Sequence, residues 1–340
     1  MKKVKLWLPI IAILLFVTAC GNSGNVSGTN KSSDKLTKVR VTEPVRGVLW
    51  GPVHVANELG YFKEEGLDVE LITLKTDTPT APVLAGEADF GLFGPEMILR
   101  LNEQGQGVKL LLSTTHKYPY SLLSSSDITE VSQLKGKSVN GADSGSSPRQ
   151  FVRAAIANAG LDPDNDVTYT NLPNSGLIAA IEKGDIKATY ASPEARQKLL
   201  DNGANLLEDI YDKEVHKAIL GSDKYEMYIT FTTDKFIKEN PEVVQKYVNA
   251  IYKAILWTNN HSSKEIADVL KPSFKELENL ESVVKEIKDN DIFSTDGSFS
   301  DDGYKAINKI AKEAKITHDF VPREKTIDDS FLKKAQENIK

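Results

Sequence analysis

The sequence contains a single cysteine, Cys20, among its 340 residues. One cysteine permits no disulfide within the chain and no cysteine-rich metal site. The five histidines also lack the spacing of metal-binding motifs. They are His54, His116, His216, His261 and His318. We therefore expect neither a bound metal nor a cofactor.

Signatures of the common enzyme classes are missing as well. The tripeptide Gly136-Lys137-Ser138 resembles the end of a phosphate-binding P-loop, but that motif requires glycine at position 131, which is Val131 here. The sequence has no Gly-x-Ser-x-Gly segment of a serine hydrolase and no His-Glu-x-x-His segment of a metalloprotease. We expect a protein without catalytic activity.

The chain also has no excess of positive charge. Its formal net charge is −6, and residues 1–19 contribute three lysines and no acid, so the rest of the chain is more acidic still. This balance argues against nucleic acid as a partner. It does not exclude an anionic solute, because the local charge of a pocket need not follow the net charge. A length of 340 residues exceeds one ordinary core and predicts two lobes.

The N-terminal segment has the pattern of a secretion signal. Lysines precede an apolar run at residues 6–18, which has the length of a signal-peptide core and is too short to span a bilayer. Small residues then stand immediately before Cys20, which resembles the lipobox of bacterial lipoproteins. The resemblance implies cleavage before Cys20, acylation of Cys20, and an anchor on the extracytoplasmic face of the cell membrane. The alternative is a secretory signal with a chance cysteine.

Residues 21–38 contain almost no apolar side chain. A Gly/Ser/Asn-rich composition of this kind cannot bury surface and predicts a flexible tether. We therefore expect a signal peptide at residues 1–19 and a tether at residues 20–38.

From residue 39 onward, strands alternate with helices. Residues 39–41, 67–74 and 90–93 are expected to form strands, with helices at 52–59 and 81–85 between them. Alternation of this kind predicts an α/β fold with parallel strands and a ligand site beside their carboxyl ends. Helices dominate the last third of the chain, with expected ranges 241–257, 262–270, 274–288, 301–315 and 328–339.

Two phrases resemble a known family. They are ANELGYFKEEGLDVEL at residues 56–71 and LAGEADFGLFGPE at residues 84–96. They are similar to the solute-binding proteins of ABC importers, in the branch serving nitrate, sulfonates, taurine and thiamine-type pyrimidines. The resemblance covers about residues 39–210 and implies a two-lobed periplasmic-binding-protein-like fold of type II. It also implies a small-molecule solute, a permease and ATPase complex as partners, and a monomer.

The implied fold divides the chain into two lobes. Lobe one should comprise residues 39–117 and 229–340, and lobe two should comprise residues 118–228. Two crossing segments, near 116–121 and 226–230, should join the lobes. Pro119 breaks regular structure in the first of them, as expected for such a segment.

Loops that follow strands and precede helices should line the ligand cleft, and two of them belong to lobe one. The first contains Trp50, whose indole could form a flat wall against a ring, and His54 one turn later. Trp50 could instead be a core residue, and His54 could be structural. The second contains Pro95 and Glu96 at a helix start. Glu96 could either satisfy the helix dipole or accept hydrogen bonds from a ligand amine.

The other two loops belong to lobe two. The third holds small residues, hydroxyls and one guanidinium at a helix start, the most anion-friendly group in the chain. Its candidates are Ser144, Ser146, Ser147 and Arg149. Arg149 could instead be solvated or paired to Asp143. The fourth loop offers Ser192, expected first as a helix N-cap, and Glu194, with Asn171 beside it.

The ligand is not fixed by these residues. Relatives that bind pyrimidines carry a Trp-Thr-Pro-Asn-Thr-Asn-His-like phrase at the first loop, and the segment from Trp50 to His54 lacks its asparagines. A small anion or a larger heterocyclic solute therefore remains open. We predict a solute-binding lipoprotein of an ABC importer. The alternatives are a pyrimidine-synthase-like enzyme of the same fold, whose cysteine-rich motif is absent here, and a sensor lipoprotein without an importer.

Overall fold

The computed structural model describes residues 36–74 and 78–339. The expected signal peptide and Cys20 lie outside the described residues, as does nearly all of the expected tether. The tether prediction extends too far at its end, because Thr37 and Lys38 already belong to strand β1. In the described part of the chain, no helix is both long and apolar enough to cross a membrane.

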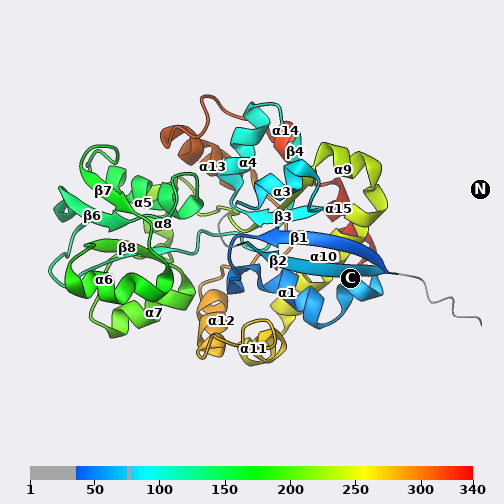
Figure 1. Ribbon diagram of the computed structural model, residues 1–340, viewed down its shortest axis with the longest axis horizontal. Coiled ribbons are helices and arrows are strands. Elements are labelled where there is room, and N and C mark those ends of the chain that lie inside the picture. Colours follow the sequence, from blue (N-terminus) through cyan, green and yellow to red (C-terminus); the bar gives the residue numbers. More distant parts are fainter. Residues whose placement is uncertain (1–35, 75–77, 340) are drawn as a thin grey trace, which may run out of the picture. The chain divides into compact units, whose positions relative to one another are not determined.

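The first sheet contains five strands in the order β2-β1-β3-β10-β4. Figure 1 labels β1, β2, β3 and β4 of this sheet. Strands β1, β2 and β3 run parallel, whereas β10 pairs antiparallel with both β3 and β4. Strand β10, the last strand in the sequence, therefore lies between β3 and β4, which come much earlier in the sequence. The bounds are β1 Thr37–Glu43, β2 Leu67–Thr73, β3 Phe90–Phe93, β4 Val108–Ser113 and β10 Ile229–Thr233.

The second sheet repeats this arrangement with the order β7-β6-β8-β5-β9. Strands β6, β7 and β8 are parallel, and β5 is antiparallel to its two neighbours β8 and β9. The bounds are β5 Ser121–Ser124, β6 Lys137–Asn140, β7 Val167–Thr170, β8 Ala188–Ala191 and β9 Asn205–Glu208. We call the elements that carry the first sheet lobe one and those that carry the second sheet lobe two.

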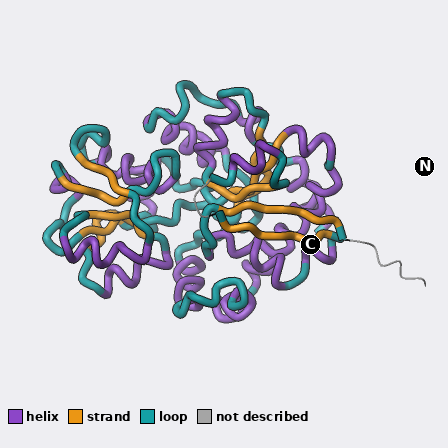
Figure 2. Tube along the Cα trace, in the orientation of Figure 1, coloured by secondary structure: helices purple, strands orange, loops and turns teal. Residues whose placement is uncertain are grey.

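Helices flank the strands of each sheet (Figure 2). Lobe one has η1 Val48–Trp50, α1 Gly51–Glu58, α2 Tyr61–Glu64, α3 Thr80–Ala85, α4 Pro95–Glu103, α9 Asp234–Glu239, α10 Pro241–Asn260, α11 Ser263–Leu270, α12 Leu280–Asp289, α13 Asp301–Glu313, α14 Arg323–Thr326 and α15 Ser330–Asn338. Lobe two has η2 Val131–Leu134, α5 Ser147–Asn158, η3 Asn174–Gly176, α6 Leu177–Lys183, α7 Pro193–Asp201 and α8 Lys213–Leu220.

Several helices start at a proline, as the sequence predicts. Pro52, Pro95, Pro193 and Pro241 stand in the first two positions of α1, α4, α7 and α10. An N–H at these positions has no partner within the helix, so its absence in proline costs little, and the fixed φ of proline already suits a helix. Three of these helices, α1, α4 and α7, follow loops chosen as candidate ligand loops.

Aromatic stacking joins the long helix α10 to the first sheet. Tyr247 of α10 stacks on Phe90 of β3 with ring centroids 3.9 Å apart, and Phe62 stacks on the same tyrosine at 5.3 Å. All three rings are fully buried. Burying rings of this size contributes several kcal/mol, with about 1 kcal/mol more from the ring geometry.

Two crossing segments join the lobes and bond to each other. The first runs from Thr114 to Tyr120, and the second runs from Gly221 to Tyr228. The amide of Thr114 donates to the carbonyl of Tyr228 at 2.8 Å, and the amide of Tyr225 donates to the carbonyl of His116 at 3.0 Å. The two connections therefore lie side by side.

The expected helix 274–288 is wrong in its first part. Helix α12 begins only at Leu280, and Pro272 to Asn279 form turns in which the amide of Leu277 donates to the carbonyl of Phe274 at 3.0 Å. The apolar spacing that suggested a helix instead places Phe274 against His54, with ring centroids 5.0 Å apart. Strand β9 and helix α8 were not predicted, although Asp212 caps α8 by accepting from the amides of Glu214 and Val215.

Candidate functional site

Four aromatic rings from both lobes form one cluster. Trp50 comes from η1 after β1, Tyr228 precedes β10, Tyr120 precedes β5, and Tyr190 lies in β8. The ring of Trp50 meets that of Tyr228 edge-on with centroids 4.5 Å apart, and Tyr120 lies 5.3 Å from Tyr190. The hydroxyls of Tyr120 and Tyr228 are 2.5 Å apart. We call these four residues the aromatic cluster.

Two polar side chains beside this cluster are buried without a hydrogen-bond partner. Trp50 is 4 % exposed and its Nε1 has no partner among the described residues. Ser192 is 7 % exposed, and its Oγ has none either. Ser192 occupies the predicted N-cap position of α7, but its side chain makes no capping bond. A buried polar atom left unpaired costs about 1–3 kcal/mol, so both atoms suit a ligand that pairs with them.

Glu194 connects lobe two to the first candidate loop. Its Oε1 accepts from the backbone amide of Val48 at 3.0 Å, and Oε2 has no hydrogen bond to any described residue. Burial raises the pKa of Tyr228 well above its usual range, and the nearby charges of Tyr120 and Glu194 add to the shift. Its hydroxyl therefore stays protonated, and the carboxylate of Glu194 lies close to the aromatic cluster.

Glu96 is buried where the two lobes meet. It is 1 % exposed, its Oε2 accepts from the hydroxyl of Ser147 in α5, and its Oε1 accepts from the hydroxyl of Tyr225 at 2.6 Å. Burial raises the pKa of the Glu96 carboxyl, although both hydroxyls lower it in part. Pro95 opens α4 beside it and is buried too. Glu96 lies in the first turn of α4, where the dipole alternative places it, and its two oxygens also bond to side chains of this chain.

The third loop uses its anion-binding groups internally. The guanidinium of Arg149 donates to the carbonyl of Ala142 at 2.6 Å and to that of Gly141 at 3.2 Å, and it lies 4.1 Å from the ring centroid of Tyr169. No ion pair joins it to Asp143 in the described part of the chain. Desolvation lowers the pKa of Arg149.

The hydroxyls of Ser146 and Ser147 also have partners within the chain. Ser146 Oγ donates to the carbonyl of Asp143 at 2.7 Å, and Ser147 Oγ bonds to Glu96. Ser144 is exposed, and its carbonyl accepts from Gln150. Asn171 is exposed and donates to Asp143 at 2.7 Å.

His54 lies inside lobe one. It is fully buried, with its Nε2 3.3 Å from Glu43 Oε2. Glu43 Oε1 accepts from Thr73 at 2.6 Å and from Arg46 at 3.0 Å. These donors and His54 lower the pKa of the Glu43 carboxyl against the opposing effect of burial. The structure places His54 in this internal network, in agreement with the alternative that His54 is a structural residue.

The structure thus brings Trp50, Ser192 and Glu194 together, and it adds tyrosines that the sequence analysis did not select. These are Tyr118, Tyr120, Tyr190, Tyr225 and Tyr228. Four of them come in pairs spaced by two or three residues in the crossing segments, Tyr118-Pro-Tyr120 and Tyr225-Glu-Met-Tyr228. Such pairs in a connection between lobes were the signal that could have identified them.

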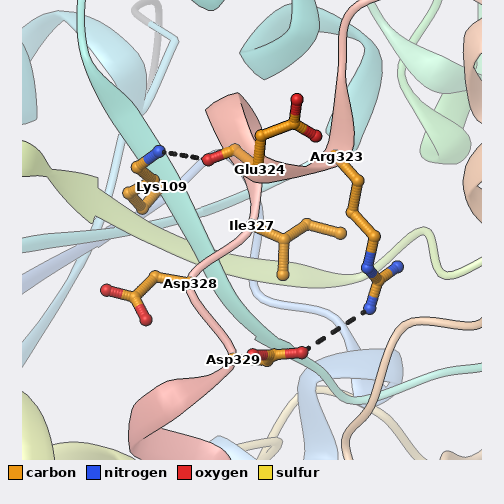
Figure 3. A pocket seen from close by; sticks show the side chains of 6 residues that line it. All are labelled: Lys109, Arg323, Glu324, Ile327, Asp328 and Asp329. Atoms are coloured by element: carbon orange, nitrogen blue, oxygen red, sulfur yellow. Dashed lines mark hydrogen bonds and ion pairs between the residues drawn. The ribbon is translucent and has the colours of Figure 1, made fainter.

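A separate cavity of about 450 Å³ lies in lobe one (Figure 3). Its lining comprises Lys109, Arg323, Glu324, Ile327, Asp328 and Asp329. Lys109 Nζ already donates to the carbonyls of Glu324 and Lys325, and Arg323 donates to that of Phe299 at 2.9 Å. Because its cations are held by backbone carbonyls, we assign this cavity no role. The described residues contain no group of three or more side chains able to hold a metal ion.

Curated relatives cover most of the chain. YtlA of Bacillus subtilis, named as a binding protein, is 26% identical over 90% of this chain and 92% of its own length. A Bacillus subtilis protein named for binding aliphatic sulfonates is 27% identical over 96% of both chains. The 4-amino-5-hydroxymethyl-2-methylpyrimidine phosphate synthase of Candida albicans is 26% identical over 60% of this chain and 61% of its own length.

Solved structures confirm the predicted fold. A Methylobacillus flagellatus protein described as the sulfonate-binding SsuA superposes with a TM-score of 0.64 at 18% identity, over 90% of this chain and 95% of its own. A Candida albicans protein with the generic periplasmic binding protein fold superposes with a TM-score of 0.67 at 15% identity, over 89% and 95%. The α/β, two-lobed periplasmic-binding-protein-like fold is therefore established. The model of one family, described as NMT1/THI5 like, matches residues 50–264, and the chain belongs to that family.

Proposed function

We propose that this chain is the extracytoplasmic solute-binding component of an ABC importer, and that it holds a small solute between its lobes without changing it. Full-length similarity to two Bacillus subtilis binding proteins supports this role. The observation that carries it is the aromatic cluster, which receives rings from both lobes and stands beside two buried polar atoms without partners. A permease and an ATPase are the partners that such a component serves.

The aromatic cluster and Glu194 favour a flat, nitrogen-rich solute over a sulfonate. Trp50 and the tyrosines offer faces and edges for stacking, and a cation over such a face gains about 0.5–2 kcal/mol. The free oxygen of Glu194 accepts hydrogen bonds from N–H groups, and a charged acceptor strengthens them. Trp50 Nε1–H and Ser192 Oγ can pair with ring nitrogens or oxygens.

A sulfonate finds less at this interface. The guanidinium of Arg149 and the hydroxyls of Ser146 and Ser147 already have partners within the chain. Among the described residues, no lysine or arginine makes a hydrogen bond or ion pair with the aromatic cluster, Glu96 or Glu194. We therefore propose a small aromatic amine, amidine or aminopyrimidine as the solute class, with an alkanesulfonate as the competing class.

The test is a binding comparison on the full-length protein. Benzamidine and 4-aminopyrimidine represent the first class, and taurine and ethanesulfonate represent the second. We expect members of the first class to raise the melting temperature and to give measurable heats of binding. Glu194→Gln should weaken that binding tenfold or more, the loss expected for a hydrogen bond to a charged group. Glu87→Gln, an exposed carboxylate in lobe one, serves as the matched control. Binding of sulfonates alone would contradict the assignment.

We also propose that Cys20, which lies outside the described residues, carries the lipid anchor and places the protein on the outer face of the cell membrane. Cells fed a labelled fatty acid should label the wild-type protein. The variant Cys20→Ala should lose the label and leave the protein soluble or held by an uncleaved signal. Equal labelling of both proteins would exclude Cys20 as the acceptor.

An enzyme of the same fold is the second candidate, because pyrimidine synthases are among the relatives. Those relatives match 60–66% of this chain, whereas the binding proteins match 90% or more. A sensor lipoprotein is the third candidate. Genes for a permease and an ATPase beside this gene would favour the importer over the sensor, and turnover of a bound pyrimidine by the purified protein would favour the enzyme.

A further inference from the structure

The N-terminal ends of helices α4 and α5 meet where the two lobes are in contact. Gly94 and Glu96 stand at the start of α4 in lobe one, and Ser147 is the first residue of α5 in lobe two. The hydroxyl of Ser147 donates to Glu96, while the hydroxyl of Tyr118 from the first crossing segment donates to the carbonyl of Ser147 at 2.6 Å. We call Gly94, Glu96 and Ser147 the corner contact.

Glycines allow the lobes to approach this closely. A Cβ at Gly94 would stand 2.0 Å from Ser147 Oγ, and a Cβ at Gly145 would stand 2.7 Å from the methyl carbon of Met97. Each glycine therefore faces a side chain of the opposite lobe. Gly94 has φ −92° and ψ 153°, a conformation that any residue adopts, so contact with its surroundings rather than backbone geometry disfavours a side chain there.

The carboxylate of Glu96 depends on this approach. Its two oxygens are paired by one hydroxyl from lobe two and one from the second crossing segment, and no cation of the described residues contacts it. Separating the lobes removes the partner from lobe two. A buried hydrogen-bonding group is costly to leave without its partner, so the bond between Glu96 and Ser147 favours the closed arrangement.

We propose that the corner contact is a closure device: Gly94 and Ser147 are positioning residues that let the lobes close, and Glu96 fastens them without touching the solute. This inference rests on the proposed solute-binding function. A ligand that binds only the closed arrangement shifts the equilibrium by its differential affinity. The corner contact sets how far that equilibrium must be shifted, and therefore the apparent affinity for any solute.

A second contact between the lobes supplies a remote reporter. The backbone amide of Val48 donates to the side chain of Glu194, and Val48 is fully buried. That bond breaks when the lobes separate, but it shares no residue with the corner contact. Exchange of the Val48 amide with deuterium therefore reports opening of the lobes, and amides of Leu110 and Leu112 in β4 report the stability of lobe one.

The experiment measures hydrogen exchange on the full-length protein without added solute, in wild type and in Gly94→Ala and Ser147→Ala. Gly94→Ala inserts a methyl group between the lobes, and Ser147→Ala removes the bond to Glu96. Both should speed exchange at Val48 by tenfold or more, with β4 unchanged. Matched controls are Gly176→Ala, where nothing lies within 4 Å of the added carbon, and Ser132→Ala at an exposed position of η2.

A double variant distinguishes separation of the lobes by the added methyl group from a local disturbance around residue 94. Ser147→Gly clears the space that the alanine at position 94 needs, so Gly94→Ala should change Val48 exchange much less in a Ser147→Gly background. Additive effects, or faster exchange confined to the peptides around 94 and 147, would overturn the proposal. Because no solute is used, this outcome is independent of whether the solute screen succeeds. A wild type that binds no solute would defeat the proposed function while leaving the exchange result intact.

Discussion

At the scale of single residues, the contact between Gly91 and Phe231 is a tight constraint on the first sheet. Gly91 lies in β3 opposite Phe231 of β10, and a Cβ there would stand 2.3 Å from the phenylalanine ring. Gly91→Ala should therefore lower the free energy of unfolding by about 1–3 kcal/mol, the usual penalty of overpacking a core. Chemical denaturation of the variant measures the loss.

A smaller partner should relieve the same clash. Combining Gly91→Ala with Phe231→Leu should cost less than the sum of the two single changes, because the added methyl group then has room. Additive losses would show that the ring of Phe231 is not the obstacle.

Arg149, which the sequence predicts as a ligand contact, also makes contacts within the chain that the sequence did not reveal. Its guanidinium holds two carbonyls and lies over Tyr169. Arg149→Ala should therefore lower the free energy of unfolding by about 1–3 kcal/mol. Arg149→Lys should lose part of this, because an ammonium cannot reproduce the planar fork.

Measurements of solute binding distinguish this structural role of Arg149 from a role in binding an anion. With the solute class proposed above, Arg149→Ala should change the dissociation constant less than threefold, measured by calorimetry at a temperature where the variant is folded. A tenfold loss of affinity with unchanged stability would restore Arg149 to the ligand site.

At the scale of elements, His216 of α8 fastens the two crossing segments. Its Nε2 accepts from the amide of Tyr118 at 3.1 Å, and its Nδ1–H donates to the carbonyl of Ser222 at 2.6 Å. This network requires the neutral ring. Burial, helped by Lys117 and Lys224, lowers the pKa of His216 to about 4 against the opposing effects of the Ser222 carbonyl and Asp223.

This geometry predicts an acid-sensitive connection. In the unfolded chain the ring takes up a proton near its ordinary pKa of about 6.5, whereas the folded ring stays neutral down to about pH 4. The stability due to His216 is therefore complete above about pH 6.5 and falls as the pH drops towards 4, by roughly 3 kcal/mol in total. Urea denaturation at pH 7, 5.5 and 4.5 measures the slope.

The variant His216→Gln keeps a donor and an acceptor but cannot be protonated. It should be less stable than wild type at pH 7 and should lose less of its remaining stability on acidification. An unchanged slope in the variant would assign the acid sensitivity to other groups, of which buried His116 is the nearest candidate, since burial lowers its pKa too.

Elements with strong local signals were predictable from the sequence. The expected helices 52–59 and 81–85 agree with α1 and α3 to within one residue at each end, and Pro95 opens α4 as predicted. The segment before Leu280 was not, because its apolar residues at helical spacing pack on His54 from turns instead. Periodicity shows which side chains are buried, but turns can bury them as well as a helix can.

At the scale of the whole molecule, the fold class predicted from the sequence is confirmed, and three of the predicted site residues lie in a candidate site whose tyrosines were not predicted. Trp50, Ser192 and Glu194 follow strands, so the rule for parallel sheets identified them. Tyr120 and Tyr228 lie in the crossing segments, which belong to no strand–helix unit. Their proximity depends on the pairing of Thr114 with Tyr228, a contact between positions 114 residues apart. No local pattern encodes such a pairing.

The third loop shows the same difference between local sequence patterns and contacts made by distant residues. Its composition indicated an anion site, but the carbonyls of Gly141 and Ala142 lie within reach of Arg149, and Glu96 arrives from the other lobe. Whether a polar group is free for a ligand depends on neighbours that the sequence does not place. The fold class can be predicted from the alternation of strands and helices. The ligand depends on which polar side chains remain without a hydrogen-bond partner in the folded protein.

The central claim is that the chain holds a flat, nitrogen-rich solute between its lobes and leaves it unchanged. The most direct test is mass spectrometry of the full-length protein saturated with its tightest ligand from the solute screen, before and after denaturation. We predict one solute molecule per chain, released with its original mass, and loss of the complex in Trp50→Ala. Release of a chemically altered molecule, or an unweakened complex in that variant, would contradict the account.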